Sequence, residues 1–149
     1  MTTIISGGAG FIGINLIKKI LTKNSKIKVL DNFSNSSIEY INRLRSKNIE
    51  VIKCDLSNLE DVKKNIEKIL FKSESNLEIW HLAANSDIAS GTNNPMIDLK
   101  DTFMTTFNLL EIARIHSINS FYFASSSAVY GDHGSKHIDE DTGPMMPIS

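Results

Sequence analysis

The residues with the clearest chemistry lie at the start of the chain. Gly7, Gly10 and Gly13 are spaced three apart, between the β-branched stretch 2–6 and the apolar stretch 14–21. A strand, a glycine turn and a helix in this order are typical of a dinucleotide-binding loop. Glycine lets a pyrophosphate approach the backbone, and the first turn of a helix offers free N–H groups. Glycine clusters also form ordinary turns, which is the alternative interpretation. We predict that the loop contacts a cofactor through Gly7, Gly10, Phe11, Ile12 and Gly13.

A carboxylate follows the second predicted strand. Asp31 comes directly after the apolar stretch 27–30, about twenty residues beyond the glycine turn, where dinucleotide-binding folds place an acid that accepts the ribose hydroxyls. An aspartate here repels the 2′-phosphate of NADP, and the first arginine in the sequence is Arg43. The pattern therefore favours NAD over NADP. The alternative is that Asp31 only caps a turn.

Strands and helices alternate along the whole sequence. We predict strands at 2–6, 27–30, 49–54, 77–81 and 121–124, and helices near 11–22, 36–45, 57–70 and 96–115. Such alternation predicts an α/β fold, a Rossmann-type doubly wound parallel sheet in the order 3-2-1-4-5. A ligand crevice is then expected at the carboxyl ends of the first and fourth strands.

Smaller signals refine this outline. Ser36-x-x-Glu39 and Ser57-x-x-Glu60 predict helix N-termini, and a polar loop containing Gly91 and Pro95 is expected to lead into the long helix at 96–115. His133 and His137 are four residues apart, but they lie in a glycine-containing loop, so we predict no metal site.

Composition restricts the class of protein. The chain has 149 residues, a formal net charge of −1 with mixed signs, and a single cysteine, Cys54. We expect one domain that binds neither nucleic acid nor membrane. A lone cysteine excludes an internal disulfide and suits a reducing compartment, and with no membrane-length apolar run this predicts a cytoplasmic protein.

Five stretches together carry a family resemblance. They are Gly7-Gly8-Ala9-Gly10-Phe11-Ile12-Gly13, Asp31-Asn32, Asp55-Leu56, His81-Leu82-Ala83-Ala84 and Ser125-Ser126-Ser127-Ala128-Val129-Tyr130-Gly131. In this order they resemble the N-terminal portion of an extended short-chain dehydrogenase/reductase. The resemblance is to the NAD-dependent sugar-nucleotide epimerase/dehydratase family, and within it to UDP-glucose 4-epimerase-like proteins.

The resemblance implies a role for each matching residue, with NAD as cofactor and a sugar-nucleotide, of the UDP-sugar kind, as substrate. Ser126 corresponds to the family's catalytic serine or threonine. The further cofactor-binding residues implied are Asp31, Asn32, Asp55, Leu56, Ala83 and Ala84, with the adenine beside Asp55 and Leu56 and the nicotinamide ribose beside the alanines. The implied substrate-binding residues are Asn85, Ser86 and Ser127. A homodimer through the helix near 96–115 is also implied.

Two departures from the family pattern matter. Thr102 belongs to the stretch where many relatives have an Asn-Val-x-Gly-Thr sequence, and Asp101 or Thr102 is the expected substitute for its asparagine. No tyrosine of this sequence has a lysine four positions on, so the family's Tyr-x-x-x-Lys base is missing. The resemblance implies that 1–149 is an incomplete NAD-binding domain, without the last strands and the C-terminal substrate domain, and that this fragment is inactive.

Two other functions stay open. One is a sugar-nucleotide 4,6-dehydratase or reductase of the same family, although dehydratases usually have Thr-Asp-Glu where this chain has Ser126-Ser127-Ala128. The other is a non-catalytic, NAD-sensing module, which the missing tyrosine favours.

Overall fold

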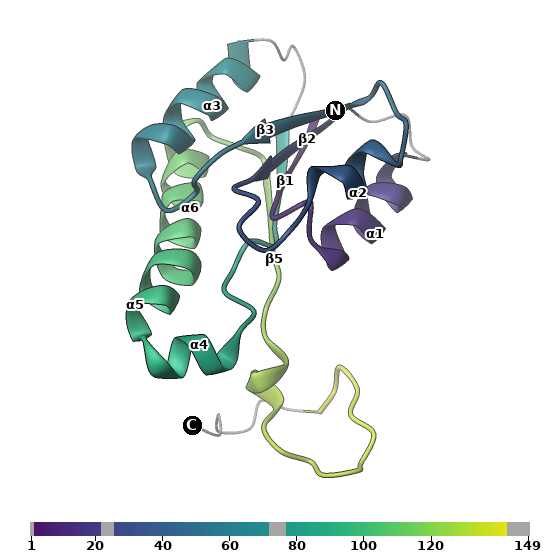
Figure 1. The fold of residues 1–149 in the computed structure, drawn as a ribbon, viewed down its shortest axis with the longest axis vertical. Helices are drawn as coiled ribbons and strands as arrows, with labels where there is room; N and C mark the ends of the chain where they lie inside the picture. Colours follow the sequence, from purple (N-terminus) through teal and green to yellow (C-terminus); the bar gives the residue numbers. More distant parts are fainter. Residues whose placement is uncertain (1, 22–25, 72–76, 143–149) are drawn as a thin grey trace.

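Five parallel strands form one sheet in the order β3-β2-β1-β4-β5 (Figure 1). The structure is a computed structural model that describes residues 2–21, 26–71 and 77–142. Its elements are β1 (Thr2–Ser6), α1 (Phe11–Leu21), β2 (Lys26–Asp31), α2 (Ile38–Asn42), β3 (Ile49–Lys53), α3 (Leu59–Phe71), β4 (Leu77–His81), α4 (Ile88–Asn93), α5 (Pro95–Asp98), the π-helix η1 (Leu99–Met104), α6 (Thr105–Ile115), β5 (Ser120–Phe123) and the 3₁₀-helix η2 (Ser127–Tyr130).

The predicted strand order is confirmed, and β1 lies at its centre. Ile4 of β1 is opposite Lys28 of β2 and Ile79 of β4, and every residue of β1 is buried. A strand covered by helices on both faces needs apolar or internally bonded side chains on both, which explains its β-branched sequence. The carboxyl ends of β1 and β4 therefore meet at one edge of the sheet.

Each face of the sheet has its own apolar core. Figure 1 shows α3 and α6 on one face and α1 and α2 on the other. Ile4, Ile66 and Ile112 belong to the first core, while Ile5 and Ile17 belong to the second. Alternate side chains of β1 thus enter opposite cores, as the period of two in a strand requires.

The region between β4 and β5 differs from the prediction. The expected loop around Gly91 contains α4, and the expected single helix at 96–115 is divided into α5, η1 and α6. Asp87 begins α4 by accepting a hydrogen bond from the backbone N–H of Ser90 at 3.1 Å. Asn94 caps α5, with Pro95 in its first turn. These caps are the sequence signals that predict an additional helix start.

Two predicted caps are displaced by one residue. Ser37, not Ser36, caps α2, and the side chain of Asn58, not that of Ser57, accepts the first N–H groups of α3. The hydroxyls of Ser36 and Ser57 donate instead to Asp31 and Asp55. Each serine hydroxyl is therefore bonded to an aspartate at or just after the end of the preceding strand.

Strand β5 forms the edge of the sheet, with one neighbour. Tyr122 and Phe123 are exposed, and the Tyr122 ring stacks on Trp80 of β4 with centroids 4.3 Å apart. After β5 the chain runs away from the sheet into η2 and a loop over 131–142 (Figure 1). In the parts of the chain that the structure describes, no helix is long and apolar enough to cross a membrane. The cytoplasmic location stays a prediction.

Candidate functional site

A cavity of about 490 Å³ opens at the carboxyl ends of the strands, in the predicted crevice. Its walls come from the segments that follow β1, β2, β3 and β4 and from η1 and α6. The lining residues are Gly7, Gly10, Phe11, Ile12, Gly13, Asp31, Asn32, Ser34, Asn35, Ser36, Cys54, Leu56, Leu82, Ala83, Ala84, Asn85, Ser86, Asp101 and Thr105. All five residues predicted from the glycine loop line the cavity.

The three glycines of the Gly-x-x-Gly-x-x-Gly pattern, Gly7, Gly10 and Gly13, have different structural roles. Gly7 has a φ of +65°, and a Cβ there would lie 2.8 Å from the backbone N and Cα of Ala83. A Cβ on Gly13 would lie 2.5 Å from the backbone of Gly8. On Gly10 the nearest described atom would be the carbonyl oxygen of Gly7, at 3.3 Å. Gly7 and Gly13 are therefore required by the fold, whereas Gly10 leaves space at the cavity wall.

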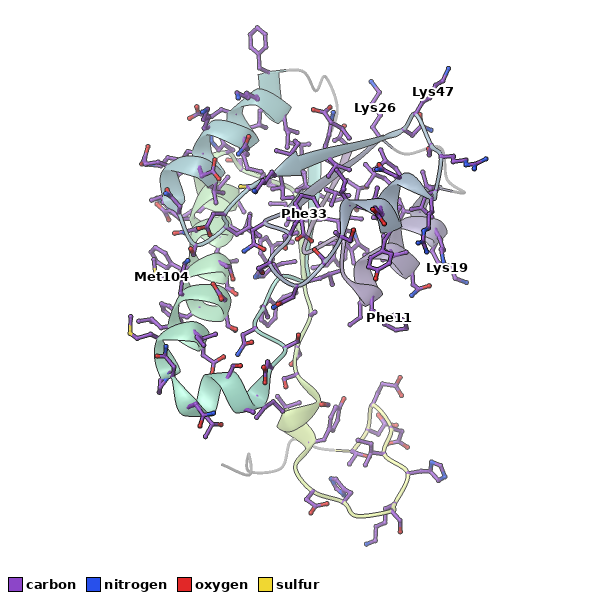
Figure 2. All side chains as sticks on the ribbon, viewed as in Figure 1. Phe11, Lys19, Lys26, Phe33, Lys47 and Met104 are labelled. Atoms are coloured by element: carbon purple, nitrogen blue, oxygen red, sulfur yellow. The ribbon has the colours of Figure 1, made fainter. Side chains whose placement is uncertain are left out.

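The first turn of α1 forms one wall of the cavity. Phe11 and Ile12 are 86% and 64% exposed, and Figure 2 shows the Phe11 side chain projecting away from the sheet. The amide of Ile14 donates to the carbonyl of Gly10, so the helical hydrogen bonds begin there. The earlier amides have no partner within the helix, which makes this end suitable for an anion.

Asp31 connects the glycine loop to the segment after β2. Its carboxylate is 7% exposed: Oδ2 accepts from the amide of Ala9 at 3.0 Å, and Oδ1 accepts from the amide of Phe33 and the hydroxyl of Ser36, both at 2.9 Å. A carboxylate oxygen has about two acceptor sites. Oδ2 therefore keeps one for a ligand hydroxyl, and Oδ1 accepts another only if a present donor moves.

Asp55 and Leu56, in the segment that follows β3, differ in their position relative to the cavity. Leu56 lines the cavity, but Asp55 does not. Oδ1 of Asp55 accepts from the amide and the hydroxyl of Ser57, at 3.0 and 2.7 Å, and the hydroxyl bond is the main reason why its pKa lies below the usual value. Oδ2 lies 3.9 Å from Nζ of Lys100, and both side chains are largely exposed, so this pair contributes little stability. The role of Asp55 beside an adenine stays a prediction.

The segment after β4 forms the floor of the cavity. Ala83, Ala84, Asn85 and Ser86 all line it. The backbone amide of Asn85 donates to Oγ1 of Thr102 at 3.0 Å. Thr102, one of the two expected substitutes for the family's asparagine, thus anchors this segment to η1.

The side chain of Asn85 is occupied within the protein. Its Nδ2 donates to Oδ1 of Asp98 at 2.8 Å and to the carbonyl of Asp87 at 2.9 Å, and its Oδ1 accepts from the amide of Asp87. A substrate would contact this residue through its backbone unless those bonds exchange. Its substrate-binding role stays a prediction.

Ser126 and Ser127 do not line the cavity. Both are exposed and follow β5, at the sheet edge. The structure thus brings the predicted cofactor-binding residues together, except Asp55, and leaves both serines outside. Their catalytic and substrate-binding roles stay predictions.

Several lining residues were not predicted. Ser34, Asn35 and Ser36 form a polar run that is separated from Asp31 and Asn32 by Phe33 alone, and this proximity was the available signal. The other unpredicted residues are Cys54, Leu82 and Thr105, while Asp101, the other expected substitute for the family's asparagine, also lines the cavity. Burial raises the pKa of the Cys54 thiol to about 12, so it remains a neutral, unreactive group.

Metal ligands do not cluster in the described part of the chain. No three histidine, cysteine, aspartate or glutamate side chains there are placed to bind one ion. Nε2 of His133 lies 2.9 Å from the carbonyl of Tyr130.

Comparison with known proteins adds the family context. A family model described as GDP-mannose 4,6 dehydratase matches residues 4–149. A bifunctional UDP-glucose and UDP-xylose 4-epimerase of Pisum sativum is 32% identical over 135 residues, which are 86% of this chain and 37% of the pea protein.

Solved structures agree with this match. A UDP-glucose 4-epimerase of Thermus thermophilus in complex with NAD superimposes with a TM-score of 0.84 and 26% identity, covering 99% of this chain and 45% of that one. A Thermotoga maritima UDP-glucose 4-epimerase with UDP-glucose gives a TM-score of 0.79 and 27% identity, covering 99% and 45%. The chain thus spans less than half the length of these relatives.

Proposed function

Because the chain belongs to the NAD-dependent epimerase/dehydratase family, as the N-terminal, UDP-glucose 4-epimerase-like portion, we propose that its cavity binds NAD for a sugar-nucleotide 4-epimerase. The observation that carries the proposal is the position of the cavity. It lies where the glycine loop, the first turn of α1 and the buried Asp31 converge at the switch point of the sheet. The NAD bound to the Thermus epimerase supports it by similarity.

The lining residues fit the parts of a dinucleotide. The space at Gly10 and the first turn of α1 suit a pyrophosphate, and the free acceptor site on Oδ2 of Asp31 suits a ribose hydroxyl. A buried carboxylate at this point also disfavours the 2′-phosphate of NADP. Leu56 supplies an apolar surface for the adenine, and the small side chains of Ala83 and Ala84 leave room for the second ribose.

The chemistry requires groups that this cavity does not contain. Bound NAD would supply a hydride acceptor for C4 of the sugar and a hydride donor to the opposite face of the resulting ketone. Ser126 would donate a hydrogen bond to the C4 oxygen, after the chain around η2 approaches the cavity. The proton of that oxygen needs a base with a suitable pKa, and the family's Tyr-x-x-x-Lys does not occur in 1–149.

The substrate proposal is a UDP-sugar, placed beside Asn85, Ser86 and Ser127. The Thermotoga epimerase solved with UDP-glucose supports this by similarity. A non-catalytic NAD-binding module is the second candidate.

A homodimer is proposed through η1 and α6. Phe103, Phe107 and Leu110 are 59%, 50% and 48% exposed, and the two phenylalanine rings stack with centroids 6.4 Å apart. An exposed apolar stripe of this kind is typical of an interface.

The test separates binding from turnover. Calorimetric titration of the purified 149-residue chain should detect NAD binding and weaker NADP binding. Epimerisation of UDP-glucose or UDP-galactose should be undetectable, because general-base catalysis alone contributes about a hundred- to ten-thousand-fold. A longer chain that supplies Tyr-x-x-x-Lys and a substrate domain should turn over. Failure to bind NAD would refute the proposed function, and turnover by 1–149 would refute the need for that base.

A further inference from the structure

A chain of side-chain hydrogen bonds crosses the interior beneath the cavity floor. The ring of His81, 1% exposed at the end of β4, lies between two hydroxyls: Nδ1 is 2.6 Å from Oγ of Ser6, and Nε2 is 2.9 Å from Oγ1 of Thr106. Oγ of Ser6 also accepts from the amides of Leu82 and Ala83, at 3.2 and 3.4 Å, and the Leu82 amide is shared with the carbonyl oxygen of Ser6, at 3.1 Å. Oγ1 of Thr106 donates to the carbonyl of Thr102 at 2.8 Å.

The positions of the hydrogens in this network follow from counting donors and acceptors. A hydroxyl has one hydrogen, and that of Thr106 is used on the carbonyl of Thr102. Thr106 must therefore accept from His81, which places a hydrogen on Nε2. A neutral ring with Nε2–H has a bare Nδ1, which accepts the hydroxyl hydrogen of Ser6. The two lone pairs of Ser6 Oγ then match the two amides of the floor.

The opposite tautomer of His81, with the ring hydrogen on Nδ1, does not satisfy every donor of the network. With the hydrogen on Nδ1, the ring N–H and two amides would face the two lone pairs of Ser6 Oγ, and the Leu82 amide would be left to the Ser6 carbonyl alone. The hydroxyl hydrogen of Ser6 would have no acceptor among the described residues. A charged ring with hydrogens on both nitrogens has the same defect. Phe121 and Phe123 cover the ring, with centroids 6.0 and 5.7 Å away, and supply no counter-charge. Burial accordingly lowers the pKa of His81 to about 4.

We propose that His81 is a positioning residue. As the neutral Nε2–H tautomer it orients Ser6, whose Oγ holds the Leu82–Ala83 backbone at the cavity floor. Through Thr106 it also connects that floor to the π-helix η1. The network thereby joins β1, β4 and η1–α6 in one directed series of hydrogen bonds. The same π-helix reaches the floor a second time, through the bond from Asn85 to Thr102. The consequence of this network for cofactor affinity rests on the proposed function, while the tautomer of His81 and the fixed cavity floor do not.

The tautomer is tested first. Imidazole ¹⁵N chemical shifts of the labelled protein at neutral pH, assigned with His81→Gln, should show a protonated Nε2 and a bare Nδ1. Protonation at Nδ1, or at both nitrogens, would overturn the proposal.

The fixed floor is tested with Ser6→Ala and a matched control. Thr3→Val also removes a side-chain hydrogen bond between β1 and β4, from Thr3 to Glu78, at the other end of the strands. Hydrogen exchange at the Ala83 amide, measured relative to core amides such as that of Ile79, should be about ten- to a hundredfold faster in Ser6→Ala. The Leu82 amide keeps the Ser6 carbonyl as an acceptor and should change less. Exchange at both amides should be unchanged in Thr3→Val. Equal exchange in the two variants would overturn the proposal.

Cofactor affinity distinguishes this inference from the proposed function. Ser6→Ala should weaken NAD binding by roughly tenfold, the effect of one or two lost hydrogen bonds, while Thr3→Val should leave it unchanged. Equal affinities would refute the positioning role. If the unmodified chain binds no NAD, the proposed function fails, and the tautomer and the exchange rates still decide the network.

Discussion

Asp31 and Ser126 both lie at the carboxyl end of a strand of the same sheet, but their surroundings differ. Asp31 is the last residue of β2, which has a strand on each side, and its buried carboxylate accepts three hydrogen bonds. Ser126 follows the edge strand β5 and is exposed, outside the cavity. An interior strand places its end by contacts on both sides, whereas an edge strand has half of them. The cofactor end of the site, which is the cavity lined by residues between Gly7 and Thr105, therefore does not include the serine segment, Ser125–Ser127.

The strongest test of the comparison uses two glycines of one loop. Gly10→Val should weaken NAD binding by at least about a hundredfold, or about 3 kcal/mol, because the side chain fills space at the cavity wall. Its circular dichroism and melting temperature should stay near those of the parent. Gly13→Val should instead lower the melting temperature strongly, because its Cβ meets the backbone of Gly8. Full NAD affinity in a folded Gly10→Val protein would break the assignment of the cofactor end.

The second test uses the pH dependence of stability. The pKa of His81 lies at about 4 in the folded protein, below its ordinary value of 6.5. Between these values the unfolded chain binds a proton that the folded chain does not, so stability is fully present above about pH 6.5 and decreases as the pH falls toward 4. The total change is about 3 kcal/mol.

Denaturant unfolding at several pH values measures this change. His81→Gln is the matched control, because it removes the titrating group and should flatten the stability curve within that window. The same slope in both proteins would show that the floor of the cavity does not contain a buried neutral histidine.

The third test concerns the charge at Asp31. Asp31→Asn keeps an acceptor oxygen for the Ala9 amide but removes the negative charge, so the ratio of NAD to NADP affinity should fall by roughly tenfold. Asp31→Ala also removes the bond to the glycine loop and should weaken both cofactors. An unchanged ratio in Asp31→Asn would mean that Asp31 only organises the loop.

The smallest effect is expected at Ser126. Ser126→Ala should change the NAD affinity of the 149-residue chain by less than about twofold, because Ser126 lies outside the cavity. In a longer, active chain the same substitution should reduce turnover strongly while leaving NAD affinity intact. A clear loss of NAD affinity in the 149-residue chain would show that the serine segment already reaches the cofactor end.

The hydrophobic periodicity of the sequence predicted the sheet well, because the burial of the strands determines that periodicity. The five predicted strands agree with the observed ones to within a residue at each end, and the predicted strand order is confirmed. The glycine loop was predictable for a similar reason, since Gly7 and Gly13 occupy positions that reject a Cβ. Local sterics and alternating burial leave a direct mark on the sequence.

Details that depend on contacts between distant residues were not predictable. Ser36 resembles a helix cap in sequence, but Asp31 takes its hydroxyl. The π-helix η1 has no sequence pattern of its own, and it occurs together with the hydrogen bonds that Thr102 accepts from the Asn85 amide and the Thr106 hydroxyl. The bond from the Ser57 hydroxyl to Asp55 is local but is likewise not revealed by periodicity, and the role of Asp55 beside an adenine stays a prediction.

The stacking of Trp80 on Tyr122 gives the protein an internal optical probe. Trp80 is the only tryptophan in the sequence, and its ring packs on the edge strand. Opening of β5 separates the two rings while the sheet from β3 to β4 remains intact, so indole fluorescence reports this edge and far-ultraviolet circular dichroism reports the whole sheet. Coincident transitions of the two signals would mean that the edge melts with the body as one cooperative unit. A fluorescence change at lower denaturant would measure the free energy of fraying at the strand that carries the serine segment.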